Sequence, residues 1–132
     1  MAVEIGVSDG ASLNPAQDEP TIWLTSDGYY WFLHPLIERL RTDTGQYIDL
    51  YGDAVFLGPD LVKLKQTLVE ARALVQSQPL EWDVHVRTQI SPSHKELYSS
   101  VERSKFLQLI DSWEEIIERA QALNRPVVCF GD

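Results

Sequence analysis

Apolar residues recur along two stretches of the chain with the period of an amphipathic helix. In residues 60–76, five of them are spaced alternately three and four apart, which places them on one face of a helix. They are Leu61, Leu64, Leu68, Ala71 and Val75. A wider stripe in residues 104–123 consists of Phe106, Leu109, Ile110, Trp113, Ile116, Ile117 and Ala120. Because each stripe covers a single face, we expect both helices to lie on one side of a sheet.

Shorter apolar segments predict the strands of that sheet. Two of them, Glu4–Val7 and Thr21–Leu24, are separated by a polar loop. Residues 80–89 alternate between apolar and polar side chains, which is typical of a half-buried strand. Val127–Phe130 is apolar throughout, and such a run predicts a central strand that is buried on both faces. Residues 97–101 fit either a short strand or the start of the second long helix.

Glycine and proline suggest where the remaining elements begin and end. Tyr47–Tyr51 and Ala54–Leu57 flank Gly52-Asp53, and glycine at the first central position favours a hairpin with a type II′ turn. Proline is tolerated at the start of a helix but interrupts one that has already formed. We therefore expect a short helix that begins at Pro35 and ends near residue 43. The preceding segment, Tyr29–Leu33, fits either a strand or a helix.

Together these elements predict an α+β fold. We expect a mixed sheet of about five or six strands with the two long amphipathic helices packed on one face. The chain has 132 residues, the usual size of one domain, so residues 1–132 are treated as a single domain. A domain of this size buries enough apolar surface to fold without a disulfide or a metal ion. Its one cysteine, Cys129, rules out an internal disulfide.

The charge of the chain is strongly negative and unevenly distributed. The formal net charge is −9, and residues 1–60 contain ten acidic residues against two basic ones, Arg39 and Arg41. Such a surface repels nucleic acid and anionic membranes and attracts basic proteins. No apolar run is long enough to cross a bilayer, and the first residues lack a basic segment followed by an apolar one. We therefore expect a cytoplasmic protein that binds neither nucleic acid nor membrane.

Four consecutive aromatic residues, Tyr29 to Phe32, lie in the same acidic half. They cannot all point in one direction, so some are expected at the surface, where aromatic side chains are typical of protein interfaces. The alternative is that they simply form the core of a small domain. The partner-binding surface predicted on this basis comprises Asp18, Glu19, Asp27, Tyr29, Tyr30, Trp31, Asp43, Asp49 and Asp53.

Signals of catalysis are sparse. Asp83, His85 and Arg87 alternate along one predicted strand, and on one face they could bind an anion or transfer a proton. A polar, solvent-facing strand explains the same pattern. Cys129 lies inside an apolar run and is expected to be buried. A buried thiol is unreactive, so we do not expect Cys129 to act as a nucleophile. No nucleophile elbow, phosphate-binding loop or metal-binding spacing is present in the sequence, so we expect no metal and no cofactor.

Two functional hypotheses of different classes follow. The first is a non-catalytic domain that presents an acidic, aromatic surface to a basic protein. Its most concrete form is an immunity or inhibitor protein that neutralises a cationic toxin, such as a nuclease, in the bacterial cytoplasm. The second is a small enzyme or ligand-binding domain that uses Asp83, His85 and Arg87. An accessory subunit of an assembly would leave the same sequence pattern as the first hypothesis.

Overall fold

The structure is a computed structural model that describes residues 2–10, 15–90 and 92–131. Its strands are β1 (Val3–Val7), β2 (Thr21–Leu24), β3 (Asp53–Phe56), β4 (Glu81–Gln89), β5 (Lys95–Glu102) and β6 (Val127–Gly131). Its helices are α1 (Asp27–Thr44), α2 (Pro59–Gln76) and α3 (Arg103–Leu123). The predicted α+β class, with about six strands, is confirmed.

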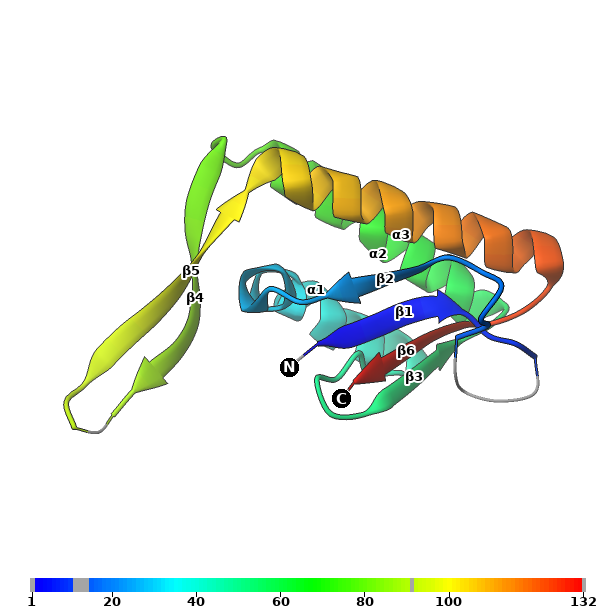
Figure 1. Cartoon of the computed structure of the whole chain (residues 1–132), viewed down its shortest axis with the longest axis horizontal. Helices are drawn as coiled ribbons and strands as arrows, with labels where there is room; N and C mark the ends of the chain where they lie inside the picture. The colour runs from blue at the N-terminus through cyan, green and yellow to red at the C-terminus, as the bar shows by residue number, and fades with distance from the viewer. Residues whose placement is uncertain (1, 11–14, 91, 132) are drawn as a thin grey trace.

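The strands form two sheets, which corrects the prediction of one mixed sheet. Four strands pair in the order β2-β1-β6-β3, and β4 pairs with β5 alone in a ribbon that leaves the body of the molecule (Figure 1). Every pairing between these strands is antiparallel. The three helices lie on one side of the four-stranded sheet (Figure 1). The other side, called the open face below, carries none of these helices and is covered in part by the loop residue Pro15, which lies against Gly6. Strand β1 begins beside the end of β6, with Val3 opposite Gly131.

Helix α1 begins eight residues before the proline at which we predicted its start. Ser26 caps it, since the Ser26 hydroxyl accepts a hydrogen bond from the Gly28 N–H at 3.2 Å. Gly45 ends it in the left-handed conformation at φ 77°. Pro35 lies inside the helix on its exposed side, where water can satisfy the carbonyl group that loses its partner. Burial of the opposite side holds the helix together, through Tyr30, Leu33, Leu36, Ile37 and Leu40.

The predicted hairpin over residues 47–57 is wrong. Strand β3 pairs with β6, and the segment before it crosses the end of the sheet instead of pairing alongside β3. Two hydrogen bonds fix this path: Gly131 N–H donates to the Gly52 carbonyl at 2.8 Å, and Val55 N–H donates to the Gln46 side chain at 2.9 Å. The second bond occupies the free edge of β3. Burial of Ile48 and Leu50 explains why tertiary packing overrides the local turn signal.

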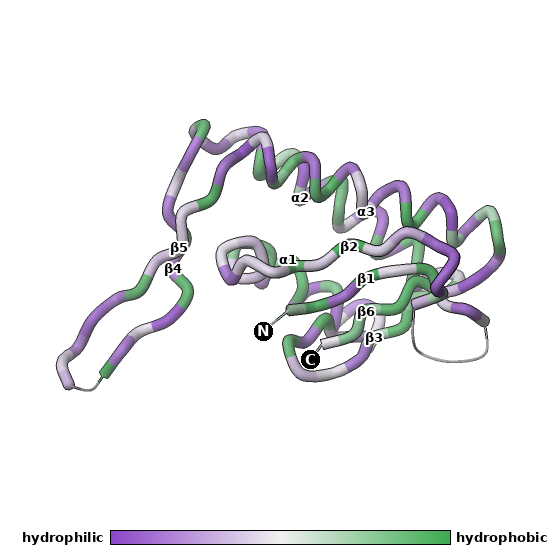
Figure 2. Tube along the Cα trace, in the orientation of Figure 1, coloured by the Kyte–Doolittle hydropathy of each residue, from purple (hydrophilic) through white to green (hydrophobic). Residues whose placement is uncertain are grey.

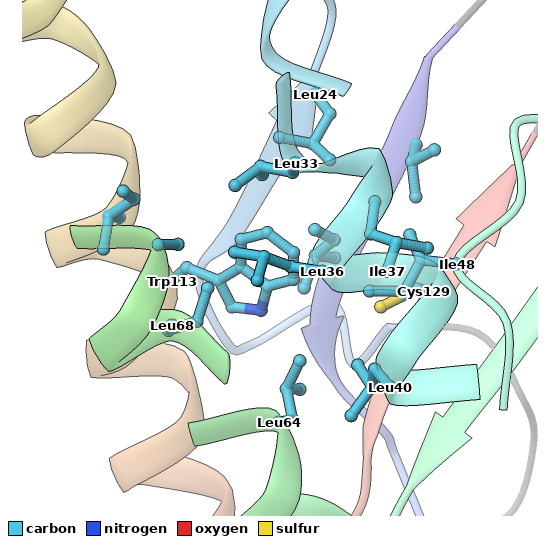
Figure 3. Packing of buried hydrophobic residues seen from close by; sticks show 14 of the residues in the cluster. Leu24, Leu33, Leu36, Ile37, Leu40, Ile48, Leu64, Leu68, Trp113 and Cys129 are labelled. Carbon is cyan, nitrogen blue, oxygen red and sulfur yellow. The ribbon is translucent and has the colours of Figure 1, made fainter. Parts of the chain in front are cut away.

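The core lies between the sheet and the helices. All five residues of the α2 stripe are buried, and of the predicted α3 stripe only Leu109 is less than fully buried. Trp113 extends from α3 into the space beside α1 and α2, where it lies among Leu36, Leu64 and Leu68 (Figure 3). From the sheet, Ile5 and Cys129 face the same core. Val128 points to the opposite face and is also buried, so the predicted burial of β6 on both faces holds except at Phe130, which is 37% exposed.

The β4–β5 ribbon is anchored to the body by a cluster of aromatic rings. Phe32 of α1 contacts both Trp82 of β4 and Phe106 of α3, with ring centroids 5.3 and 5.5 Å apart. Tyr29 joins the cluster, 4.6 Å from Phe106. Hydrophobic and hydrophilic residues alternate along the rest of the ribbon (Figure 2). Among the described residues, no helix combines the length and the apolar character needed to cross a bilayer.

We expect the Cys129 thiol to be unreactive in the folded protein. Its side chain is buried, and burial raises the pKa of the thiol, which keeps it from forming the nucleophilic thiolate. A thiol reagent added to the native protein should therefore label it slowly, and labelling should become fast in denaturant. Rapid labelling of the native protein would place β6 outside the core.

Candidate functional site

A cleft of about 250 Å³ lies between the start of α1, the segment 47–51 and β4 of the ribbon. Four aromatic residues line it: Tyr30, Trp31, Tyr47 and Tyr51. Its charged residues are Asp27, Asp49 and Arg87. We take this cleft as the candidate functional site because it gathers aromatic rings and carboxylates from two separate parts of the chain, with Val86 and Arg87 added by β4.

The helical conformation of α1 explains how the aromatic run is distributed. Successive helical residues point about 100° apart, so the four rings spread around the helix. Tyr30 faces the core, Tyr29 and Phe32 face the ribbon and α3, and Trp31 faces outward, 36% exposed. Asp27 lies in the first turn, where the helix dipole favours a carboxylate. The run is therefore partly core, as one alternative held, and partly surface.

Hydrogen bonds to α1 hold the segment 47–51 in place. The Tyr30 hydroxyl donates to the Ile48 carbonyl at 2.8 Å, and burial raises the pKa of Tyr30, so that this donor keeps its proton. The Tyr47 hydroxyl lies 3.1 Å from His34 Nε2, and the Arg41 guanidinium lies 4.7 Å from the centre of the Tyr47 ring. These contacts with α1 hold the backbone of residues 47–48 in place. The side chains of this segment that face the cleft therefore have defined positions.

The outer part of the same wall is exposed. Tyr51 is 68% exposed, although Tyr47, Ile48 and Leu50 in the same segment are buried or half-buried. Asp49 accepts a hydrogen bond from the Tyr51 N–H at 3.2 Å through Oδ1, which orients its carboxylate beside the tyrosine. With Trp31, the cleft offers two accessible rings and two carboxylates, Asp27 and Asp49. Arg87 is the single cation in its lining, so the lining is net negative.

A β-bulge in the ribbon brings Arg87 to the cleft. The pairing of β4 with β5 shifts by one residue here: His85 lies opposite Tyr98, whereas Arg87 lies opposite Leu97. Tyr98 and Leu97 are consecutive and point to opposite faces, so the bulge at Val86 turns Arg87 away from the face of His85. The prediction that Asp83, His85 and Arg87 share one strand face is therefore corrected for Arg87.

His85 belongs to a polar cluster on the outer face of the ribbon. Its Nε2 is paired with the Glu96 carboxylate, which also accepts a hydrogen bond from Thr88 at 2.8 Å and lies 3.3 Å from His94 Nε2. Asp83 lies opposite Ser100 near the base of β4. Within the described parts of the chain, no group of three or more histidine, cysteine and acidic residues is placed to hold a metal ion.

The structure disperses the other residues of the predicted partner surface. Asp18 is exposed in the loop before β2, and Asp43 is exposed near the end of α1. Glu19 is bound by Arg119, with Nε–Oε2 and Nη2–Oε1 distances of 3.0 and 3.2 Å, and its side chain is only 7% exposed. Asp53 lies on the open face of the sheet, opposite Phe130. Of the nine predicted residues, the cleft therefore unites Asp27, Tyr30, Trp31 and Asp49.

Sequence reasoning missed the contributions of Tyr47, Tyr51 and Val86 to this cleft. The two tyrosines were assigned to a hairpin strand, and nothing local indicates that their segment crosses the sheet end. No signal in the sequence marks a bulge at Val86. No protein-family model matches the chain, and no curated protein or solved structure matches it significantly.

Proposed function

We propose that the protein is a non-catalytic binding domain that engages a basic protein through the cleft at the start of α1. Its most concrete form is an immunity or inhibitor protein that neutralises a cationic toxin in the bacterial cytoplasm. The observation that supports this proposal is the placement of exposed Trp31 and Tyr51 beside Asp27 and Asp49. Aromatic anchors beside carboxylates suit the binding of lysine and arginine side chains.

Electrostatics and packing would contribute to such binding in different ways. The excess of acidic residues in positions 1–60 would attract a basic protein from a distance and speed association. Trp31 and Tyr51 would slow dissociation once their rings are covered. The alternative, an enzyme or ligand-binding domain built on Asp83, His85 and Arg87, has less support, because the bulge at Val86 separates Arg87 from the other two.

Affinity capture from the protein's own host, followed by kinetics with the captured protein, tests the proposal. We expect the captured protein to be basic. The double variant Asp27→Asn, Asp49→Asn should slow association roughly three- to tenfold, since it removes two charges but keeps the side-chain shapes. Raising the salt concentration from about 0.05 to 0.5 M should slow the wild type more than this variant. Trp31→Ala should speed dissociation by about thirtyfold, equal to about 2 kcal/mol.

The control is the double variant Glu115→Gln, Glu118→Gln, which removes two exposed charges from α3. It should leave both rate constants nearly unchanged. Loss of binding in this control, with the cleft variants unaffected, would place the interface on α3 and contradict the proposal. A small molecule that shifts the His85 signals in an NMR titration, without capture of any protein, would favour the alternative.

A further inference from the structure

The open face of the four-stranded sheet carries an ordered row of aromatic and acidic residues. Side chains of β1 alternate, so that Val3, Ile5 and Val7 face the helices while Glu4 faces outward. The strand register places Glu4 directly opposite Trp23 of β2 on one side and Phe130 of β6 on the other. Asp53 of β3 follows opposite Phe130. The row therefore reads Trp23, Glu4, Phe130, Asp53 across the sheet.

The aromatic members of this row are accessible. Trp23 is 46% exposed and Phe130 is 37% exposed, and none of the helices α1, α2 and α3 covers this side of the sheet (Figure 1). Residues directly opposite each other in an antiparallel pair have Cβ atoms about 4.5–5.5 Å apart. Glu4 thus stands between two exposed rings at close range. Large exposed aromatic residues gathered on one face are typical of a surface that binds another molecule.

The face is hollowed next to this row. A depression of about 520 Å³ is lined by Glu4, Phe130, Thr21 and Gln17, and the loop residues Pro15 and Ala16 form its end. The loop is fixed there, because Ala16 N–H donates to the Val7 carbonyl at 2.7 Å. Gly6 makes room for it: a Cβ atom at this position would lie 3.0 Å from Pro15 Cβ. The depression is thus built by the fold and can receive one long side chain.

The charge of the depression is only partly matched within the chain. Glu19 also lines it, but Arg119 already binds both Glu19 carboxylate oxygens. Among the described residues, Glu4, which lines the depression, has no side-chain hydrogen bond or ion pair, and the same holds for Asp53, which lies outside the depression on the far side of Phe130. Two carboxylates beside exposed rings therefore remain available to a cation from outside.

We infer that this face binds an arginine side chain of the basic partner, with its guanidinium group against Glu4 and between Trp23 and Phe130. A guanidinium group is planar, stacks on aromatic rings and donates paired hydrogen bonds to a carboxylate, which a lysine ammonium group cannot do. The inference rests on the proposed function, which supplies the basic partner. It adds a second contact surface for that partner, since the depression and the cleft share no lining residue.

The test is an NMR titration of the ¹⁵N-labelled full chain with a ten-residue peptide of alternating arginine and glycine. A matched peptide contains lysine in place of arginine. We expect the arginine peptide to shift the Trp23 indole N–H and the amides of Glu4 and Phe130, and to bind at least threefold more tightly than the lysine peptide. Glu4→Gln should weaken binding at least fivefold, and Phe130→Leu should weaken it severalfold. Glu115→Gln on α3 is the matched control and should bind like the wild type.

The spectrum of each free variant shows whether it is folded, so loss of binding can be separated from unfolding. Shifts confined to the Trp31 indole and the Asp27 amide would overturn this inference while leaving the proposed function intact. The absence of shifts at Glu4, Trp23 and Phe130 at millimolar peptide would overturn it as well. Failure of the proposed function would give a different result. The captured partner would not be basic, or its association rate constant would not change with the Asp27 and Asp49 substitutions.

Discussion

Replacing Trp113 by alanine should lower the free energy of unfolding by about 3–5 kcal/mol. The Trp113 side chain is 1% exposed and fills the space between α3, α1 and α2, where Leu36, Leu64 and Leu68 surround it (Figure 3). Truncation would leave a cavity that these side chains cannot fill without moving their helices. For a domain of this size, we expect the melting temperature to fall by roughly 10–20 °C, measured by circular dichroism.

Two further variants show whether the loss comes from packing. Trp31→Ala removes an indole that is 36% exposed and packs on the rings of Tyr30 and His34, and it should cost about 1–2 kcal/mol, less than Trp113→Ala. Trp113→Phe should be milder than Trp113→Ala, because it keeps a ring and removes an N–H group that has no hydrogen-bond acceptor among the described residues. Equal stability of Trp113→Ala and the wild type would mean that this side of α3 does not face the core.

Replacing Gly131 by alanine should destabilise the protein by about 1–3 kcal/mol and disturb the cleft. A Cβ atom at Gly131 would overlap the Asp49 carbonyl oxygen and come within 2.5 Å of the Leu50 carbonyl carbon. Both are backbone atoms, which cannot move aside without shifting the segment 47–51 away from β6. Because Asp49 and Leu50 line the cleft, its shape should change together with the stability.

Urea denaturation and the amide signals of residues 47–51 check this expectation. Gly52→Ala is the matched control, since its new Cβ atom would meet the Asp49 side chain at 3.2 Å, and a side chain can rotate away. The control should therefore keep nearly wild-type stability. If both variants were equally stable and their signals for residues 47–51 unchanged, that segment would not pack on the end of β6.

The sequence determined the elements whose residues interact with their near neighbours. The stripes of α2 and α3 follow the helical period, and their burial follows from that period alone. The strands β1 and β2 begin and end close to the predicted positions, since their apolar runs are short and bounded by polar residues. Cys129 was expected to be buried for the same reason, and it is.

Local signals failed where distant contacts outweigh them. Pro35 suggested a helix start, but the buried side of α1 extends on both sides of it and compensates for one missing hydrogen bond. Gly52-Asp53 suggested a hairpin, but β3 finds its partner in β6, more than seventy residues later in the chain. The division into two sheets has the same origin, because β4 and β5 pair only with each other and are anchored by rings from α1 and α3.

In the candidate sites too, some features follow from the local sequence and others from contacts between distant residues. Composition alone indicated an acidic and aromatic first half, and with it the kind of partner that we propose. Which of those residues face one another was decided by the tertiary structure. Helix α1 turns Trp31 outward, the bulge at Val86 brings Arg87 to the cleft, and the register of β1 sets Glu4 between Trp23 and Phe130. The period of the apolar residues specifies which side of a helix or strand is buried. What that side packs against depends on contacts between residues far apart in the chain.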